Sequence, residues 1–187
     1  MSKLFFRYSS MSAGKSLALL SVAHNYEERG HEVVCYTAQI ADRDGVGVIA
    51  TRAGLKRPAH VFGPATEFDT ELIGKPACVL IDEGQFLSPH QVRQLHRYAH
   101  EHRVPVLVYG LRTDFRGELF PGAAMLLGLA DVLDELRTIC ACGRKATMNA
   151  RVGADGRRVT DGPQVEIGGN ARYRAVCARC FYSGDAT

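Results

Sequence analysis

The chain has 187 residues, of which 46% are hydrophobic and 23% are charged, and its formal net charge is +3. A chain of this length can bury one substantial core with a small appendage. The charge is too mild, without a dense Lys/Arg run, to imply nucleic-acid binding, and we expect no nucleic-acid partner. No apolar stretch approaches the roughly 20 residues that span a bilayer, and the apolar run near the N-terminus is too short for a secretory signal. We therefore expect a cytoplasmic protein with no membrane partner.

The first predicted unit is a strand, a tight turn and a helix start over residues 4–16. A phosphate-binding loop needs converging backbone N–H groups, a Lys for the β- and γ-phosphates and a hydroxyl for Mg²⁺. Gly14, Lys15 and Ser16 fill the last three positions of this pattern, whereas Ser9 stands where the pattern usually has Gly. The motif taken alone is incomplete, and an ordinary helix start is the alternative.

The next residues predict a parallel βαβ unit followed by a loop. Apolar residues at helical spacing indicate a helix over 15–29, and the β-rich run 31–37 indicates a second strand. Residues 38–58 contain Gly and charge with little periodicity, which predicts a long loop without regular structure. Asp42 and Arg43 in this loop are either functional residues or part of a solvated surface turn.

An apolar run over residues 77–81 ends directly in Asp82 and Glu83. Such a run is typical of a buried parallel strand that delivers acids to the ligand-binding edge of a sheet. In P-loop enzymes an Asp at this place, the Walker-B position, holds Mg²⁺. Its occurrence after Lys15 and Ser16, in the correct order, favours a phosphate loop over an ordinary helix start.

Two short elements and a capped helix surround this strand. We expect a strand over residues 59–62 and a helix over 66–73, and Ser88 followed by Pro predicts the N-cap of a longer helix. His96 and His100 lie four residues apart on that helix. Their spacing allows a metal clip, but without a surrounding zincin pattern the sequence favours a solvated face.

The remaining elements of the main domain follow the same alternation. A buried strand over residues 104–110 leads into a charged loop that contains Phe115 and Phe120. These rings either face a ligand or pack into the core, because an exposed Phe is costly. A helix over 123–129 and a last strand over 132–139 complete the main domain.

The cysteines divide into two kinds. Cys35 and Cys78 lie inside apolar runs and are predicted core residues. The other four form two closely spaced pairs in a small, Gly-rich segment, which favours structural Zn²⁺ over disulfides: Cys140, Cys142, Cys177 and Cys180. The predicted fold class is α/β, with a P-loop NTPase (RecA-like) parallel sheet core over residues 1–138 and a small C-terminal zinc-binding β lobe over 139–187.

Several stretches together resemble the thymidine kinase family of the cytosolic, P-loop type with a zinc lobe. The matching segments follow the family's order over nearly the whole chain and include the phosphate loop, Asp42-Arg43, residues 110–122 and both Cys pairs. The most specific matches are Asp82-Glu83-Gly84-Gln85-Phe86 and Ile167-Gly168-Gly169 followed by Tyr173. Ser9 in place of Gly and the Cys-x-Cys spacing of the first pair are similar to enterobacterial-type members.

The resemblance implies transfer of the ATP γ-phosphoryl group to the 5′-hydroxyl of thymidine, with Glu83 as general base and Mg²⁺ held by Ser16 and Asp82. It also implies a homotetramer with feedback inhibition by dTTP. The implied ATP-binding residues are Ser9, Ser10, Met11, Ser12, Ala13, Gly14, Lys15, Ser16, Asp82, Glu83, Gly84 and Gln85. The implied thymidine-binding residues, some of them on a lobe loop over about 157–172, are Met11, Phe86, Leu111, Phe115, Val165, Glu166, Ile167, Gly168, Gly169 and Tyr173. Asp42 and Arg43 would act near the phosphates or the sugar.

Two alternatives stay open at this point. One is a nucleoside kinase of the same build that prefers deoxyuridine, because main-chain contacts would carry base recognition. The other is a P-loop ATPase whose zinc ribbon binds nucleic acid or a protein partner. Arginines in the lobe, such as Arg144 and Arg151, give the second alternative slight support, and the Asp-Glu-Gly-Gln-Phe and Ile-Gly-Gly matches count against it.

Overall fold

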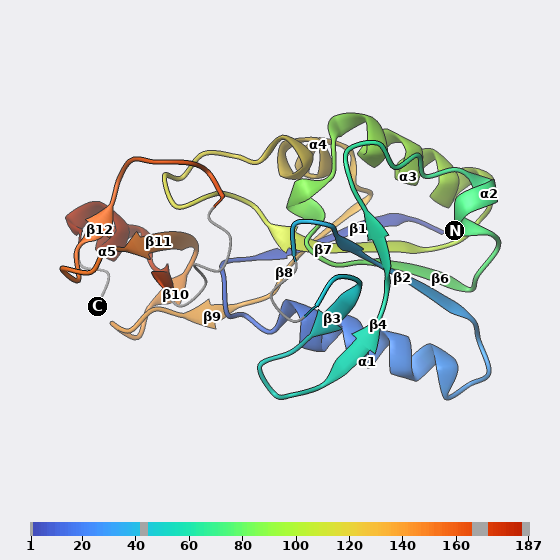
Figure 1. Ribbon diagram of the computed structural model, residues 1–187, viewed down its shortest axis with the longest axis horizontal. Helices are drawn as coiled ribbons and strands as arrows, with labels where there is room; N and C mark the ends of the chain where they lie inside the picture. The colour runs from blue at the N-terminus through green and yellow to red at the C-terminus, as the bar shows by residue number, and fades with distance from the viewer. Residues whose placement is uncertain (1, 42–44, 166–171, 185–187) are drawn as a thin grey trace.

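The computed structural model describes residues 2–41, 45–165 and 172–184. A six-stranded sheet in the order β5-β2-β6-β7-β1-β8 forms its centre, and every adjacent pair is parallel (Figure 1). The strands are β1 (Leu4–Ser9), β2 (Val33–Ala38), β5 (His60–Phe62), β6 (Cys78–Ile81), β7 (Val106–Leu111) and β8 (Val132–Glu135). This α/β architecture confirms the predicted P-loop NTPase (RecA-like) core.

Helices cover both faces of the sheet (Figure 1). The helix α1 packs on one face and the others on the opposite face, the bounds being α1 (Lys15–Glu27), α2 (Thr70–Ile73), α3 (Pro89–Glu101) and α4 (Pro121–Leu129). Side chains of β6 alternate between two cores: Cys78 and Leu80 pack on the α1 side, and Val79 and Ile81 pack on the α3 side. Because both faces are covered, the strand is apolar along its whole length. None of the described helices is long and apolar enough to cross a membrane.

The helix α3 begins where the sequence predicts. The hydroxyl of Ser88 accepts a hydrogen bond from the Gln91 backbone N–H at 3.1 Å, and the Gln91 side chain accepts one from the Ser88 N–H at 2.9 Å. With Pro89 at the first helical position, this capping box satisfies orphan donors at the helix start. The 3₁₀ turn η1 (Gly84–Phe86) connects β6 to this cap.

The prediction of an irregular loop over residues 38–58 is wrong. This segment contains an antiparallel hairpin of two three-residue strands, β3 (Val48–Ala50) and β4 (Lys56–Pro58). Such short strands give no periodic pattern, and tertiary contacts hold them: Ile49 is buried in the core beside α1, and the Arg57 guanidinium donates to both carboxylate oxygens of Glu27 at 2.7 and 2.5 Å. Asp42 and Arg43 lie outside the described residues.

Two further element boundaries differ from prediction. The helix expected over residues 66–73 is reduced to α2, because the Asp69 carboxylate accepts from the Leu72 N–H at 2.8 Å and caps the helix there. The strand expected over 132–139 divides into β8 and β9 (Thr138–Ile139). The division follows from pairing. Among the described strands β8 pairs only with β1, whose last residue paired with β8 is Tyr8, and the chain then leaves the main sheet.

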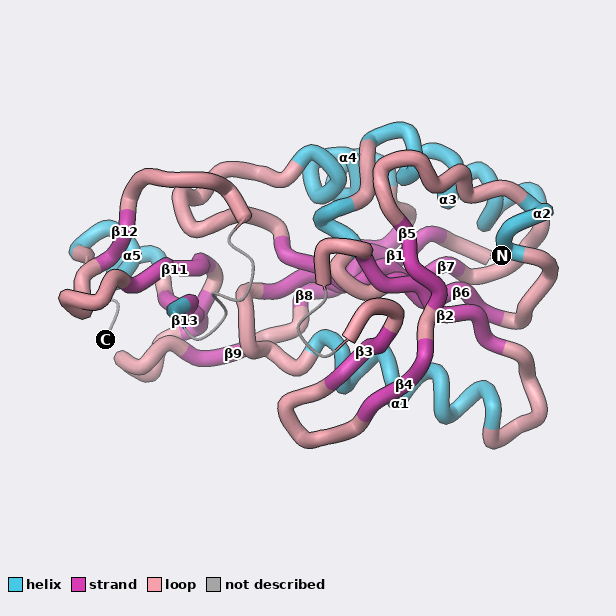
Figure 2. The backbone as a smooth tube through the Cα atoms, viewed as in Figure 1, coloured by secondary structure: helices cyan, strands magenta, loops and turns pink. Residues whose placement is uncertain are grey.

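The C-terminal lobe lies beyond the carboxyl ends of the main strands (Figures 1 and 2). It contains a two-stranded sheet and a three-stranded antiparallel sheet in the order β12-β11-β13. The remaining elements are β10 (Lys145–Ala146), β11 (Met148–Val152), β12 (Arg158–Val159), β13 (Tyr173–Val176) and α5 (Ala178–Ser183). Its buried apolar cluster is small: Cys140, Ala146, Ala150, Val176, Cys177 and Phe181.

Candidate active site

The phosphate loop turns from β1 into α1 with a strained backbone. Gly14 is the N-cap of α1 and has φ 78°, and Ser12 also has a left-handed φ of 62°. The Lys15 ammonium donates to the Ser9 hydroxyl and to the Ser10 carbonyl, both at 3.1 Å, so that its side chain folds back over the loop. Burial lowers the pKa of Lys15, and the neighbouring acids oppose this shift. The loop thus holds a partly buried cation at the carboxyl edge of the sheet.

Asp82 and Ser16 meet across this edge. The Ser16 hydroxyl donates to the Asp82 carboxylate at 2.8 Å, and Asp82 is only 4% exposed. Burial is the main cause that raises the pKa of Asp82 to about 7, and the negative charge of Glu83 adds to this shift. A poorly solvated carboxylate beside a hydroxyl is a donor set that fits a hard divalent cation such as Mg²⁺.

Glu83 occupies an unusual backbone conformation next to this pair. Its φ and ψ of 55° and 38° are left-handed, which costs a non-Gly residue about 1–3 kcal/mol and is typical of functional sites. Gln85 orients the Glu83 carboxylate by donating to it at 2.5 Å, and its own carbonyl accepts from the Leu111 N–H at 2.9 Å. Gly84 is required between them, because a Cβ atom there would lie 2.1 Å from a methyl group of Val108.

A single cavity of about 420 Å³ joins these groups to an apolar wall. The phosphate loop, the end of β6, the β3–β4 hairpin, the loop after β7 and the lobe all contribute to it. Among the residues predicted from the sequence, it brings together Met11, Ser12, Ala13, Gly14, Lys15, Ser16, Asp82, Glu83, Gln85, Phe86, Leu111, Phe115, Val165 and Tyr173.

Other predicted residues lie elsewhere. Ser9 and Ser10 are buried beneath the loop, and Gly84 is buried against β7, so none of the three lines the cavity. Glu166, Ile167, Gly168 and Gly169 lie outside the described residues.

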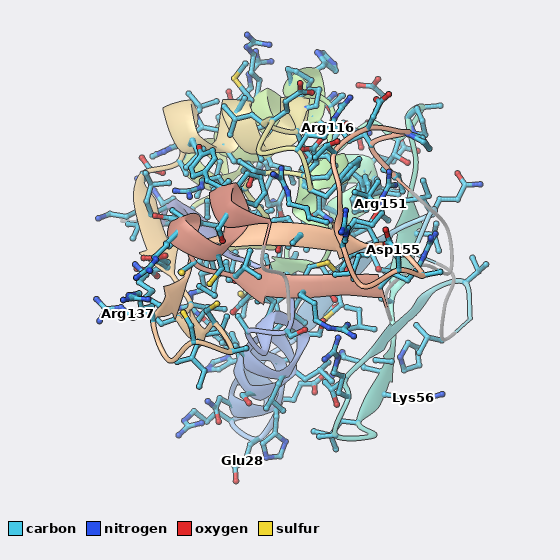
Figure 3. The ribbon with its side chains drawn as sticks, turned by 90° about the vertical axis from the view of Figure 1, so that its left-hand side faces the viewer. Glu28, Lys56, Arg116, Arg137, Arg151 and Asp155 are labelled. Atoms are coloured by element: carbon cyan, nitrogen blue, oxygen red, sulfur yellow. The ribbon has the colours of Figure 1, made fainter. Side chains whose placement is uncertain are left out.

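The two Phe of the loop after β7 pack inward. Phe115 is 0% exposed and Phe120 is 5% exposed, and both residues line the cavity. The Arg151 guanidinium of the lobe stacks 3.7 Å above the Phe115 ring centre. Figure 3, in which the lobe faces the viewer, shows Arg151 between Arg116 and Asp155. Phe115 and Phe120 therefore pack in the core and line the cavity at the same time.

Asp114 organises the same loop, a role that the sequence did not reveal. Its fully buried carboxylate accepts from the backbone N–H groups of Arg116 and Glu118 at 2.8 and 2.9 Å, and from the Arg116 side chain at 3.2 Å. Gln164 of the lobe donates to it at 3.2 Å. This carboxylate therefore couples the loop after β7 to the lobe.

Two other cavity residues escaped the sequence analysis. Arg52 lines the cavity from the β3–β4 hairpin, and it was missed because the hairpin itself was missed. Asn149, on β11, is 2% exposed and also lines the cavity. An isolated Asn in a weak strand carries no recognisable signal, so only the fold could place it at the site.

The four cysteines of the lobe form one cluster. Their sulfur atoms all lie within 4.8 Å of one another, and those of Cys142 and Cys177 are 3.6 Å apart. Sulfurs bound tetrahedrally to zinc at about 2.3 Å would be about 3.8 Å apart. A hydrogen bond from the Arg144 backbone lowers the pKa of Cys142, whereas side-chain hydrogen bonds with Cys142 and Cys177 raise the pKa of Cys180. The cluster therefore fits a tetrahedral metal ion, and the Cys-x-Cys spacing does not prevent it.

Comparison with known proteins agrees with this arrangement. The family model described as thymidine kinase matches residues 2–181. A thymidine kinase from Chromobacterium violaceum is 56% identical over 97% of this chain and 99% of its own length. Thymidine kinases from Albidiferax ferrireducens and Salmonella typhimurium are 54% and 51% identical, over 100% and 97% of this chain and 95% and 91% of their own lengths. The chain belongs to the thymidine kinase family.

Proposed function

We propose that this protein transfers the γ-phosphoryl group of ATP to the 5′-hydroxyl of thymidine, giving dTMP and ADP. The observation that supports this reaction best is the single cavity that contains a phosphate loop, two adjacent carboxylates and an apolar wall. Family membership supplies the nucleoside, since the relatives are named thymidine kinases. The ATPase alternative has no such support.

One half of the cavity would bind the triphosphate. Backbone N–H groups of residues 12–16 and the Lys15 ammonium would neutralise the phosphates, as phosphate loops do. Ser16 and Asp82 would hold Mg²⁺, which supplies charge neutralisation on the β- and γ-phosphate oxygens when it is bound. Ser9, Ser10 and Gly84 would support this half from below, because Ser9 and Ser10 accept from Lys15 and Gly84 permits the turn at Glu83.

Glu83 would accept the proton of the attacking 5′-hydroxyl. Its carboxylate lines the cavity next to Asp82 and is fixed by Gln85, so it is oriented before substrate arrives. A strained left-handed residue is retained where its side chain must point in one direction. Proton transfer by a positioned carboxylate is typically worth about 10²–10⁴-fold in rate.

The other half of the cavity would enclose the nucleoside. Its apolar lining includes Phe86, Leu111 and Phe115, together with Met11 of the phosphate loop and Val165 and Tyr173 of the lobe. We propose that Glu166, Ile167, Gly168 and Gly169 complete the contact with the base through their backbone. Backbone donors and acceptors matched to thymine would reject cytosine more strongly than shape alone.

We further propose that the cysteine cluster holds structural Zn²⁺ and that the chain divides into an ATP-binding domain over residues 1–138 and a lobe over 139–187. The zinc would anchor both ends of the loop over 157–172, because Cys142 precedes that loop and Cys177 follows it. Cytoplasmic location, a homotetrameric assembly and inhibition by dTTP are proposals that rest on the family resemblance.

The decisive experiment is a nucleoside panel with Mg·ATP. Thymidine, deoxyuridine, deoxycytidine and deoxyguanosine are incubated with wild type, Glu83→Gln and Glu71→Gln, and the 5′-monophosphates are quantified. We expect dTMP from wild type and from Glu71→Gln, whose substitution lies on the exposed surface of α2. Glu83→Gln should lose about 10²–10⁴-fold in kcat while keeping its affinity for ATP.

Each other outcome has a definite meaning. Faster formation of dUMP than dTMP would assign deoxyuridine as the preferred acceptor. ATP hydrolysis without any nucleoside monophosphate, stimulated by nucleic acid, would establish the ATPase alternative. Equal activity of Glu83→Gln and wild type would remove Glu83 from the chemistry.

A further inference from the structure

Three side chains outside the cavity converge at the opposite edge of the main sheet. His96 and His100 lie one helical turn apart on α3, and Asp131 follows α4 and directly precedes β8. The His100 Nε2 atom lies 3.1 Å from one carboxylate oxygen of Asp131, and the His96 Nε2 atom lies 3.9 Å from the other. The three ligand atoms lie within 4.8 Å of one another.

The surrounding fold holds the three groups in place. The backbone N–H of Leu4, at the start of β1, donates to the Asp131 carboxylate at 2.8 Å and fixes its orientation. The imidazole rings of His96 and His100 are 4.6 Å apart between centres and stand on a helix anchored by a capping box. In metal sites, a carboxylate that binds the ion commonly accepts a hydrogen bond from a neighbouring group that does not bind it, as Asp131 accepts one from Leu4.

The distances fit a transition metal. Ligands bound tetrahedrally at about 2.0–2.1 Å are separated by about 3.3 Å, and the His–Asp separations of 3.1 and 3.9 Å lie on either side of that value. Two imidazoles and one carboxylate suit Zn²⁺, Ni²⁺, Co²⁺ or Cu²⁺, whereas Mg²⁺ and Ca²⁺ prefer all-oxygen sites. The side chains are 29%, 45% and 24% exposed for His96, His100 and Asp131, so an ion can enter and keep water ligands.

The site is separate from both functional centres already described. Asp131 and Leu4 lie at the amino ends of β8 and β1, and the phosphate loop follows the carboxyl end of β1. The six residues of β1 span about 20 Å at about 3.3 Å each. The cysteine cluster lies farther in the same direction, in the lobe (Figure 1).

The charges around the site permit but do not strengthen the binding of a cation. Both histidines line a hollow between α3 and α4, in which Arg93 and Arg97 contribute positive charge and Glu101 contributes negative charge. The affinity must therefore come from the ligand bonds themselves. This argues for a metal with strong imidazole bonds and against a weakly bound alkali or alkaline-earth ion.

We propose that His96, His100 and Asp131 form a second metal site, which binds one Zn²⁺ or similar transition ion through two imidazole nitrogens and a carboxylate. The ion would tie α3 to the α4–β8 connection and to the start of β1. It would leave the phosphoryl-transfer site untouched, since no ligand is shared with it.

The test compares the metal content and the metal affinity of matched variants of the full chain. Wild type, His96→Ala, His100→Ala and Asp131→Asn are saturated with Zn²⁺ and freed of loose ions by gel filtration, and their zinc content is measured. Separate samples that have received no added Zn²⁺ are titrated with Ni²⁺ by calorimetry. We expect each variant to bind one equivalent fewer, or to bind it at least tenfold more weakly. Asp131→Asn is informative because an amide oxygen can still accept from Leu4 while the charge is lost.

The control is His90→Ala, an exposed histidine on the same helix that contacts Glu67 at 3.2 Å. It should bind metal as wild type does. Because the comparison is a difference between variants, it holds whatever ion fills the cysteine cluster. Equal metal stoichiometry and affinity in wild type and in a folded His96→Ala/His100→Ala double variant, verified by circular dichroism, would overturn the proposal.

Discussion

The side-chain oxygen of Asn149 accepts a 2.7 Å hydrogen bond from the backbone N–H of Met11, a residue 138 positions earlier in the chain. The amide nitrogen of the same Asn149 side chain donates to the Thr113 carbonyl at 2.9 Å. One buried amide therefore joins the lobe to the phosphate loop and to the loop after β7. These are the three parts of the chain that must keep their relative positions for the cavity to exist.

Replacement of Asn149 by Ala should loosen this junction. The Met11 N–H and the Thr113 carbonyl would lose their partners, at a cost of about 1–3 kcal/mol. For a chain of this length this corresponds to a fall of about 2–4 °C in Tm per kcal/mol. We expect KM to rise for both thymidine and ATP. Thermal unfolding and steady-state kinetics test this, with Asn25→Ala on exposed α1 as control; a variant with unchanged Tm and KM would contradict it.

Asp82→Asn should raise the thermal stability of the protein at high pH while lowering its kinase activity. Because the folded state raises the pKa of Asp82 to about 7, the folded protein binds more protons than the unfolded chain between about pH 4 and 7. The contribution of Asp82 to the free energy of unfolding of wild type therefore falls as pH rises through this window. The neutral amide of Asn does not titrate, so the variant escapes this loss of stability, and without added Mg²⁺ it should melt several degrees higher than wild type at pH 8.

The difference in Tm between Asp82→Asn and wild type should shrink towards pH 4.5, where the wild-type carboxyl is protonated in the folded state. Kinase activity of the variant should drop by about 10²–10³-fold, because the negative charge that would hold Mg²⁺ against the phosphates has been removed. Scanning fluorimetry between pH 4.5 and 8 measures the first effect. A Tm difference that stays constant over this range would refute the assigned shift.

Arg52 should contribute to phosphate binding from the β3–β4 hairpin. It lines the same cavity as the phosphate loop, and its charge acts on Lys15. Arg52→Ala should raise KM for ATP about tenfold, equivalent to about 1.4 kcal/mol, with little change in Tm because the residue is exposed. Arg52→Lys should recover part of the loss, and Arg29→Ala, an exposed arginine beyond the end of α1, serves as control. Equal KM values for ATP in Arg52→Ala and wild type would exclude the role.

Loss of the zinc proposed for the cysteine cluster should unfold the lobe. A structural zinc site supplies about 10–16 kcal/mol of apparent binding free energy, more than the small apolar cluster of the lobe can replace. Cys180→Ser should lose the tightly held zinc, lower Tm and raise KM for thymidine more than KM for ATP. Cys35→Ala, a buried thiol of the main core, should keep its zinc. Retention of zinc by Cys180→Ser after dialysis would argue against the four-thiolate site.

Local patterns predicted much of the fold and part of the site. The strand, turn and Gly14-Lys15-Ser16 of the phosphate loop, the apolar run that ends in Asp82, and the Ser88 cap are each encoded within a few neighbouring residues. Such signals are read reliably because backbone geometry and burial on both faces act locally. The order of these elements then favoured a parallel sheet, which the structure confirms.

The contacts between distant parts of the chain had no local sequence pattern that could predict them. The β3–β4 hairpin is held by Ile49 and Arg57 against α1. The strand expected over residues 132–139 is interrupted because β1 is the one neighbour of β8 among the described strands. The sequence showed His96 and His100 at helical spacing, but their partner Asp131 lies 31 positions beyond His100. In each case the deciding interaction is between residues that are distant in the chain.

The sequence by itself determined which groups this protein can use: a Lys and a hydroxyl on a phosphate loop, two acids after a buried strand, and four thiols in a segment with little core. The tertiary structure alone decided how they are placed, by burying Asp82 next to Ser16, turning Glu83 into a left-handed conformation against β7, and clamping Met11 to Asn149. The physical reason is that residue type fixes the chemistry of a group, whereas burial and hydrogen-bond partners, which fix its charge and direction, arise only when the chain folds.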